Sequence, residues 1–136
     1  MTQSDYEKVL LALVLWREAR GEPIDAKRAV AWSIRNRVNH PTWWGGDWAT
    51  VITKKEQYSS MTHNGDPNCT KWPTATDTSW LACLEIAEAV YSESGTDPTN
   101  GATHYFDKSL DAAPPAWVAS MVHTLDSGGF HFYKGA

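Results

Sequence analysis

The sequence predicts one domain of the α+β class that is mostly helical, with a buried central helix and a loop-rich surface. Three observations lead to this prediction. An apolar run near the N-terminus suits a buried helix, two further helical patterns follow it, and extended patterns occur only in the last third of the chain. With 136 residues, 42% of them hydrophobic, the chain can bury an ordinary core, so residues 1–136 are expected to form a single domain.

The first predicted helix is the most clearly marked element. Ser4 and Glu7 have the spacing of a capping box, in which two side chains accept backbone hydrogen bonds at the start of a helix. Every residue of the segment 9–16 is apolar, so this helix has no polar face and must be surrounded by protein. Gly21 and Pro23 follow closely, and both residue types stop helices.

Two more helices and two extended segments are expected further along the chain. The helices are predicted over residues 25–38, with Asp25 as the N-cap, and over residues 77–94, because apolar residues recur there at helical spacing. Extended segments are predicted over residues 102–106 and 130–133, where aromatic residues follow turn-forming ones.

Residues 41–76 are rich in turn-forming residues and are expected to form loops, apart from one short helical or extended patch near residues 49–52. Four of the eight tryptophans lie in this region and are expected at the surface: Trp43, Trp44, Trp48 and Trp72. Exposed rings of this kind stack on sugars or on nucleic-acid bases. The alternative is that they cover the ends of a small core.

The charge balance argues against nucleic acid as the partner. Twelve basic and sixteen acidic residues give a formal net charge of −4, which repels a polyanion and favours the sugar interpretation of the tryptophans. No apolar run approaches the roughly 20 residues that span a bilayer, so no membrane partner is expected. The apolar run 9–16 follows acidic residues and precedes charged ones, so it is interpreted as mature structure and no signal peptide is expected.

Glu18 is the most informative candidate for catalysis. It lies two residues beyond the apolar run, at the C-terminal end of the first predicted helix. Apolar surroundings and the partial negative charge of a helix C-terminus both disfavour a carboxylate, so we expect Glu18 to hold a proton near neutral pH unless Arg17 and Arg20 fold toward it. A protonated carboxylic acid can donate to the oxygen that departs when a glycosidic bond breaks.

A second carboxylate for such a reaction is not obvious in the sequence. Glu22 follows Glu18 by four residues and would share its helix face only if the helix continued that far. Asp47, Asp66 and Asp107 are loop candidates without distinguishing features. A mechanism with one catalytic Glu is therefore favoured.

No metal site and no cofactor are expected, because the HExxH, CxxC, GxSxG, phosphate-binding and dinucleotide-binding motifs are absent. A zinc site assembled from distant residues stays an alternative, with His63, Cys69, His104 and His131 as candidate ligands. Cys69 and Cys83 could form one disulfide or remain free thiols. A cysteine nucleophile is also open, although Cys83 lies in an apolar helical pattern where a thiol would be inert.

A series of short motifs resembles a known family. The motifs are Glu18-Ala19-Arg20-Gly21-Glu22, Ala29-Val30-Ala31 with Asn36-Arg37-Val38, Gln57-Tyr58-Ser59, Gly95-Thr96-Asp97-Pro98-Thr99 with Gly101-Ala102 and Tyr105-Phe106, and His131-Phe132-Tyr133. In this order, over about residues 9–133, they resemble the cell-wall hydrolase family typified by bacterial spore cortex-lytic enzymes. One departure is Tyr58, since the family tends to have Phe at that place.

The resemblance implies a lysozyme-like domain that cleaves the β-1,4 bond between N-acetylmuramic acid and N-acetylglucosamine in bacterial peptidoglycan. The catalytic Glu of the family falls on Glu18, and Tyr105 is expected to orient it through its hydroxyl. In the sugar groove, substrate contacts are expected from Gln57, Tyr58, Ser59, Tyr105, Glu22 and Trp44. Whether the outcome is that of a lytic transglycosylase or of a muramidase stays open, and a monomer is expected.

A wall-degrading domain without an export signal or a separate wall-binding domain resembles a phage endolysin, held in the host cytoplasm until a membrane pore releases it. Two other classes stay open. A non-catalytic glycan-binding module would use the tryptophans for recognition and Glu18 as a structural charge. A metal-dependent peptidase would instead cut the peptide stems of peptidoglycan.

Overall fold

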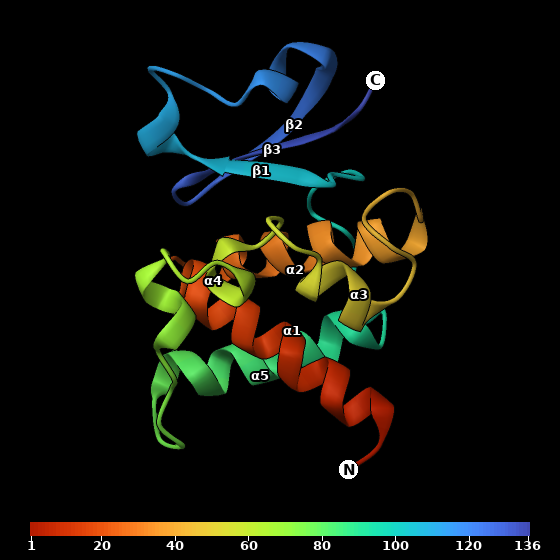
Figure 1. The fold of residues 1–136 in the computed structure, drawn as a ribbon. Helices are drawn as coiled ribbons and strands as arrows, with labels where there is room; N and C mark the ends of the chain where they lie inside the picture. Colours follow the sequence, from red (N-terminus) through yellow and green to blue (C-terminus); the bar gives the residue numbers. More distant parts are fainter.

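Helices and a small sheet form two layers in the computed structural model, which describes residues 1–136 (Figure 1). The helices are α1 (Gln3–Ala19), α2 (Ile24–Asn39), α3 (Trp48–Thr53), α4 (Ser59–Thr62) and α5 (Thr78–Tyr91), with short 3-10 helices η1 (Pro67–Thr70), η2 (Lys108–Leu110) and η3 (Ala116–Ser120). The strands are β1 (His104–Asp107), β2 (Met121–Ser127) and β3 (Phe130–Gly135). This architecture confirms the predicted helix-rich α+β class.

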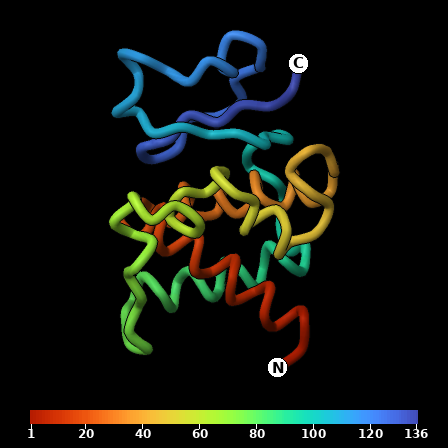
Figure 2. The backbone as a smooth tube through the Cα atoms, viewed as in Figure 1, coloured from red at the N-terminus to blue at the C-terminus, as the bar shows by residue number.

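The chain runs from the helical layer to the sheet, so the N-terminus and the C-terminus lie at opposite ends of the molecule (Figure 2). None of the helices combines the length and the apolar character that a bilayer crossing requires.

Helix α1 lies at the centre of the helical layer, as its apolar middle predicts. Leu11, Val14 and Leu15 have no exposed surface, and the helix packs against α2, α3 and α5. The same hydrophobic core reaches Phe132 of the sheet, which is also fully buried. Residues 11–17 are buried on every face of the helix, which explains why the sequence has no polar stripe there, whereas Val9, at the start of the apolar run, is 40% exposed.

The start of α1 differs from the expected capping box at Ser4 and Glu7. The box is formed instead by Thr2 and Asp5: the Asp5 backbone N–H donates to Thr2 Oγ1 over 3.1 Å, and the Thr2 N–H donates to Asp5 Oδ2 over 3.0 Å. Glu7 is buried and accepts a hydrogen bond from the Tyr91 hydroxyl at 2.8 Å, so its carboxylate is engaged between helices rather than at the helix end.

Helix α2 begins one residue before the expected N-cap, Asp25. The N-cap is Pro23, and Asp25 lies in the first turn, where a carboxylate interacts favourably with the helix dipole. Near its C-terminal end α2 buries polar side chains that hold the following loops. The Asn36 amide donates to Asp97 Oδ2 and to the carbonyl of Ala102, each over 2.9 Å, which anchors the segment that leads into β1.

The sheet has the strand order β1-β3-β2, and both pairs are antiparallel. Phe130 and Phe132 of the central strand point into the core and join the sheet to the helices. Strand β2 was not among the expected elements. Its register shifts between His123 and Leu125, and this β-bulge removes the alternation of apolar and polar residues by which a strand is recognised.

The four loop tryptophans divide into two pairs. Trp43 and Trp72 are exposed by 58% and 70%, as expected, but the expectation was wrong for Trp44 and Trp48, which are each 7% exposed. The Trp44 indole N–H donates to the carbonyl of Arg37 over 2.9 Å, and the Trp48 ring stacks near Tyr91. These two rings therefore cover the end of the core, which was the alternative interpretation.

The two cysteines are free thiols rather than a disulfide. Cys83 is fully buried in α5, and burial raises the pKa of its thiol to about 11. A thiol with so high a pKa is almost entirely protonated at neutral pH, which makes Cys83 a poor nucleophile.

The packing of α1 leads to a stability prediction. Replacing Leu15 with Ala should lower the free energy of unfolding by about 2–5 kcal/mol, because it leaves a cavity in a fully buried site. The matched control is Leu81→Ala on α5, where the leucine is 47% exposed. Its free energy of unfolding should fall by only about 0.5 kcal/mol, which is typical of surface positions. Urea denaturation measures both, and equal losses would contradict a central α1.

Candidate active site

A cleft of about 330 Å³ opens between the C-terminal end of α1, the loop before α4 and the edge strand β1. Its walls are formed by Glu18, Arg37, Trp43, Glu56, Gln57, Tyr58, His104, Tyr105 and Trp117. Four residues that the sequence singled out for the site, Glu18, Gln57, Tyr58 and Tyr105, meet here although they come from three distant parts of the chain.

Glu18 is partly buried and makes one direct contact with the opposite wall. The Tyr105 hydroxyl on β1 donates a hydrogen bond to Glu18 Oε1 over 2.9 Å, which is the contact expected from the sequence. Burial raises the pKa of the Tyr105 hydroxyl well above its usual value, and the neighbouring Glu18 adds to this shift. Tyr105 therefore keeps its proton and remains a donor at all physiological pH values.

The two arginines beside Glu18 in the sequence turn away from it. The Arg17 guanidinium donates to the carbonyls of Ser60 and Lys71 and stacks on Trp72 at 4.5 Å. Arg20 donates to Asn68 and stacks on the ring of Trp16 at 4.4 Å. Neither arginine forms an ion pair with Glu18, so the Tyr105 hydroxyl is the side-chain group that holds its carboxyl group.

Arg37 of α2 organises the wall that holds Gln57 and Tyr58. It is only 6% exposed; its Nη1 donates to Gln57 Oε1 over 3.1 Å, and its Nε donates to the carbonyl of Thr103 over 2.6 Å. Its guanidinium also lies 5.6 Å from the centre of the Tyr58 ring. One buried cation thus connects α2, the loop before α4 and the start of β1.

Aromatic rings form the more open part of the cleft. The His104 and Trp117 rings lie 4.9 Å apart, and Trp43 exposes more than half of its surface nearby. Burial and the charge of Arg37 lower the pKa of His104 to about 4, so the imidazole is neutral at physiological pH. Flat neutral rings with polar edges are suited to the faces of sugar rings.

Three residues expected to bind substrate lie outside the cleft walls. Ser59 is exposed, and its hydroxyl donates to Asp66 over 2.6 Å. Glu22 accepts a hydrogen bond from the backbone N–H of Gly129 over 2.6 Å and so holds the turn between β2 and β3. Trp44 is part of the core, and its neighbour Trp43 lies in the wall instead.

The cleft also contains residues that were not identified as site residues from the sequence: Arg37, Glu56, His104 and Trp117. The sequence contains indications for two of these residues, Arg37 and Trp117. Arg37 lies in the quoted motif with Asn36, and Trp117 follows a proline pair in the manner of a loop tryptophan. His104 was considered only as a zinc ligand, because its place in the cleft wall depends on the pairing of β1 at the edge of the sheet.

Comparisons with known proteins agree with this geometry. The sequence model of the Cell Wall Hydrolase family matches residues 21–133. A spore cortex-lytic enzyme from Halalkalibacterium halodurans is 32% identical over 117 residues, which cover 86% of this chain and 31% of that protein. The chain thus spans about a third of the length of this relative.

Two solved structures have the same fold. The catalytic domain of the germination-specific lytic transglycosylase SleB from Bacillus anthracis is 25% identical, with a TM-score of 0.69 over 98% of this chain and 97% of that one. The catalytic domain of the Bacillus cereus SleB protein is 24% identical, with a TM-score of 0.65 over 98% and 92%. The chain has the lysozyme-like α+β fold of these domains and belongs to the cell wall hydrolase family of the spore cortex-lytic enzyme type.

Proposed function

We propose that the chain is a lytic transglycosylase that degrades bacterial peptidoglycan by cleaving the glycan strand between N-acetylmuramic acid and N-acetylglucosamine. One observation carries the proposal: Glu18, at the end of a buried helix, enters an aromatic-lined cleft and is held there by the Tyr105 hydroxyl. Membership of a wall-degrading family and similarity to a structure described as a lytic transglycosylase support it.

In this mechanism Glu18 acts twice. As a carboxylic acid it gives its proton to the glycosidic oxygen, which leaves with the N-acetylglucosamine unit as the bond to the anomeric carbon breaks. The resulting carboxylate then takes the proton of the muramic C6 hydroxyl while that oxygen bonds to the anomeric carbon. The product has a 1,6-anhydro end, Glu18 has regained its proton, and no water is consumed.

The contacts around Glu18 are suited to this double role. Tyr105 engages Oε1 and fixes the orientation of the carboxyl group, so Oε2 is the oxygen that we assign to proton transfer. Trp43, Trp117 and the neutral His104 offer ring faces to the sugars on the open side of the cleft. Arg37 and Gln57 provide hydrogen-bond donors at its inner wall.

A second candidate function follows from Glu56, which lines the same cleft as Glu18. Its backbone has a φ of 67°, a left-handed conformation that costs energy for a residue other than glycine and occurs often at functional sites. If Glu56 activates a water molecule, the enzyme is a muramidase and its product has a reducing end. The product therefore distinguishes the two functions.

The role of Glu18 is tested by Glu18→Gln, which keeps the shape of the side chain but cannot give a proton. We expect the rate of peptidoglycan cleavage to fall by about a hundredfold or more, because general acid–base catalysis contributes about 10²–10⁴. The matched control is Glu85→Gln on the exposed side of α5, which should leave the rate unchanged.

Mass spectrometry of the digested peptidoglycan completes this test. Anhydro ends support the transglycosylase, whereas reducing ends that disappear in Glu56→Gln support the muramidase. Unchanged glycan strands would contradict both; new amino groups would then indicate a peptidase, and strand binding without any product would indicate a glycan-binding module.

Tyr105 is expected to act as a positioning residue. In Tyr105→Phe the ring remains and only the hydrogen bond to Glu18 is lost. A hydrogen bond to a charged group contributes roughly 1.5–3 kcal/mol, so kcat should fall about ten- to a hundredfold while KM changes little. Tyr133→Phe, on the same sheet but outside the cleft, should behave like the wild-type protein. A rise in KM with unchanged kcat would instead indicate that Tyr105 binds substrate.

The low pKa of His104 predicts a loss of stability in acid. The unfolded chain binds this proton near pH 6.5, whereas the folded protein binds it only near pH 4, so His104 lowers the free energy of unfolding as the pH falls through that range. Urea denaturation at about pH 7 and about pH 4.5 should therefore give a smaller loss for His104→Gln than for the wild-type protein. His40→Gln, at an exposed position, should follow the wild-type protein, and equal losses in all three would contradict the prediction.

A further inference from the structure

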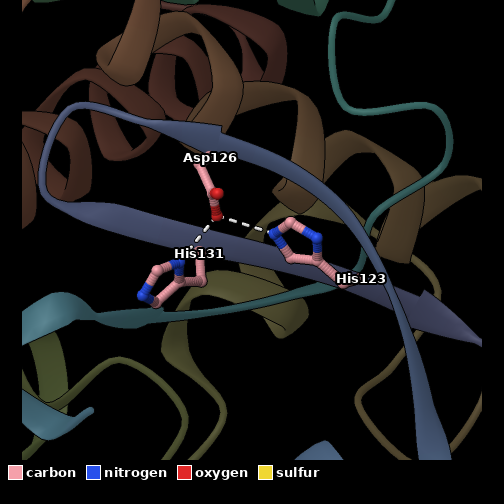
Figure 3. Close-up of side chains that lie close together, drawn as sticks. All are labelled: His123, Asp126 and His131. Atoms are coloured by element: carbon pink, nitrogen blue, oxygen red, sulfur yellow. Dashed lines mark hydrogen bonds and ion pairs between the residues drawn. The ribbon is translucent and has the colours of Figure 1, made fainter.

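His123, Asp126 and His131 form a cluster on the hairpin of β2 and β3, and none of them lines the Glu18 cleft (Figure 3). Asp126 Oδ1 lies 2.6 Å from His123 Nε2 and 2.6 Å from His131 Nδ1. The three candidate ligand atoms lie within 4.8 Å of one another. In Figure 3 both imidazole rings approach the carboxylate from their own strands, so the three side chains converge on one point.

The β-bulge in β2 creates this convergence. Residues three apart in a regular strand point to opposite faces of a sheet, so His123 and Asp126 would be separated. The register shift after His123 adds one residue to β2, which places both side chains on the face of the sheet that carries His131. Asp126 and His131 are directly opposite in the register of the hairpin.

A second carboxylate orients the His131 ring. His131 Nε2 lies 2.8 Å from Asp111 Oδ1, in the segment between η2 and η3. His131 Nδ1 donates to Asp126 Oδ1 over 2.6 Å, so a metal ion bound there would take the place of the Nδ1 proton while Nε2–H still donates to Asp111. Histidines that bind metal ions almost always have such a partner on their second nitrogen.

We propose that His123, Asp126 and His131 bind a Zn²⁺ ion through Nε2, Oδ1 and Nδ1, with Asp111 holding His131 in place. Two imidazole nitrogens and one carboxylate oxygen are a donor set that zinc accepts, whereas Mg²⁺ and Ca²⁺ prefer oxygen ligands alone. Ligands of a tetrahedral zinc ion at about 2.0–2.1 Å lie about 3.3 Å apart, so small side-chain rotations bring these three atoms into place. The fourth position is open to water.

This assignment differs from the zinc site that the sequence left open. Of His63, Cys69, His104 and His131, only His131 belongs to the cluster. His123 and Asp126 carry no metal-binding spacing in the sequence, because their proximity depends on the bulge.

A Zn²⁺ ion bound to His123, Asp126 and His131 would help to fix the shape of the Glu18 cleft. It would tie β2 to β3 and, through Asp111, to the segment that precedes η3. That short helix carries Trp117, whose ring packs against Tyr133 of β3 at 5.6 Å and forms part of the Glu18 cleft. Zinc would therefore stabilise the hairpin and the aromatic wall without taking part in bond cleavage.

Isothermal titration of the tag-free chain of residues 1–136 with zinc chloride tests the proposal. We expect one ion per chain in the wild-type protein and an affinity at least about tenfold lower in His123→Ala and in Asp126→Asn, since each loses a ligand. Asp111→Asn should weaken binding by about 10–100-fold through the loss of the carboxylate on His131. His40→Ala, which removes an exposed histidine elsewhere, should bind like the wild-type protein.

Two further measurements test zinc binding independently of the titration. Zinc should raise the Tm of the wild-type protein and of His40→Ala but not that of His123→Ala, and Co²⁺ in place of zinc should give the visible absorption of a tetrahedral site. His123 and Asp126 side chains are 46% and 50% exposed, so both variants should fold, which circular dichroism checks. No zinc binding by the wild-type protein, or equal affinity in His123→Ala and His40→Ala, would overturn the proposal.

Discussion

The burial of residues 11–17 of α1 on all sides of the helix is the constraint on which the rest of the structure depends. A helix with no polar face needs neighbours all around it, and α2, α3 and α5 provide them. Arg17 directly follows the apolar segment and is still buried, so the shell of helices ends at the next residue, which is partly exposed. Glu18 occupies that place, and the sheet closes over it from the other side, so the candidate acid stands at the boundary between a dry core and an open cleft.

Polar groups also join the two layers, in addition to the apolar contacts of Phe130 and Phe132. Arg37 reaches Gln57 and the carbonyl before β1, while Tyr105 reaches Glu18. Unpaired, such groups would be costly inside a protein, but here each one has a partner in another element. The contacts that orient the side chains of the candidate site therefore also help to hold the sheet on the helices.

Much of this arrangement follows from local patterns in the sequence. The three long helices were recognised from apolar spacing, and Glu18 from its position after an apolar run. Strand β2 was missed because its bulge interrupts the period of two, and Trp44 was misplaced because nothing local reveals its bond to the Arg37 carbonyl. The roles of Arg37 and His104 depend on pairings between distant segments, which spacing along the chain does not contain.

The hydrogen bond from Gly129 to Glu22, four residues beyond Glu18, is a further contact between the helical layer and the sheet. Gly128 in the same turn has a φ of 54°, and a Cβ there would lie 2.5 Å from Glu22 Oε1 and 2.8 Å from Ala26 Cβ, so the tip of the hairpin fits closely against the turn between α1 and α2. Because this contact does not involve Tyr105 or Glu18, its loss would free the tip of the hairpin from the helices and still leave the hydrogen bond across the cleft in place.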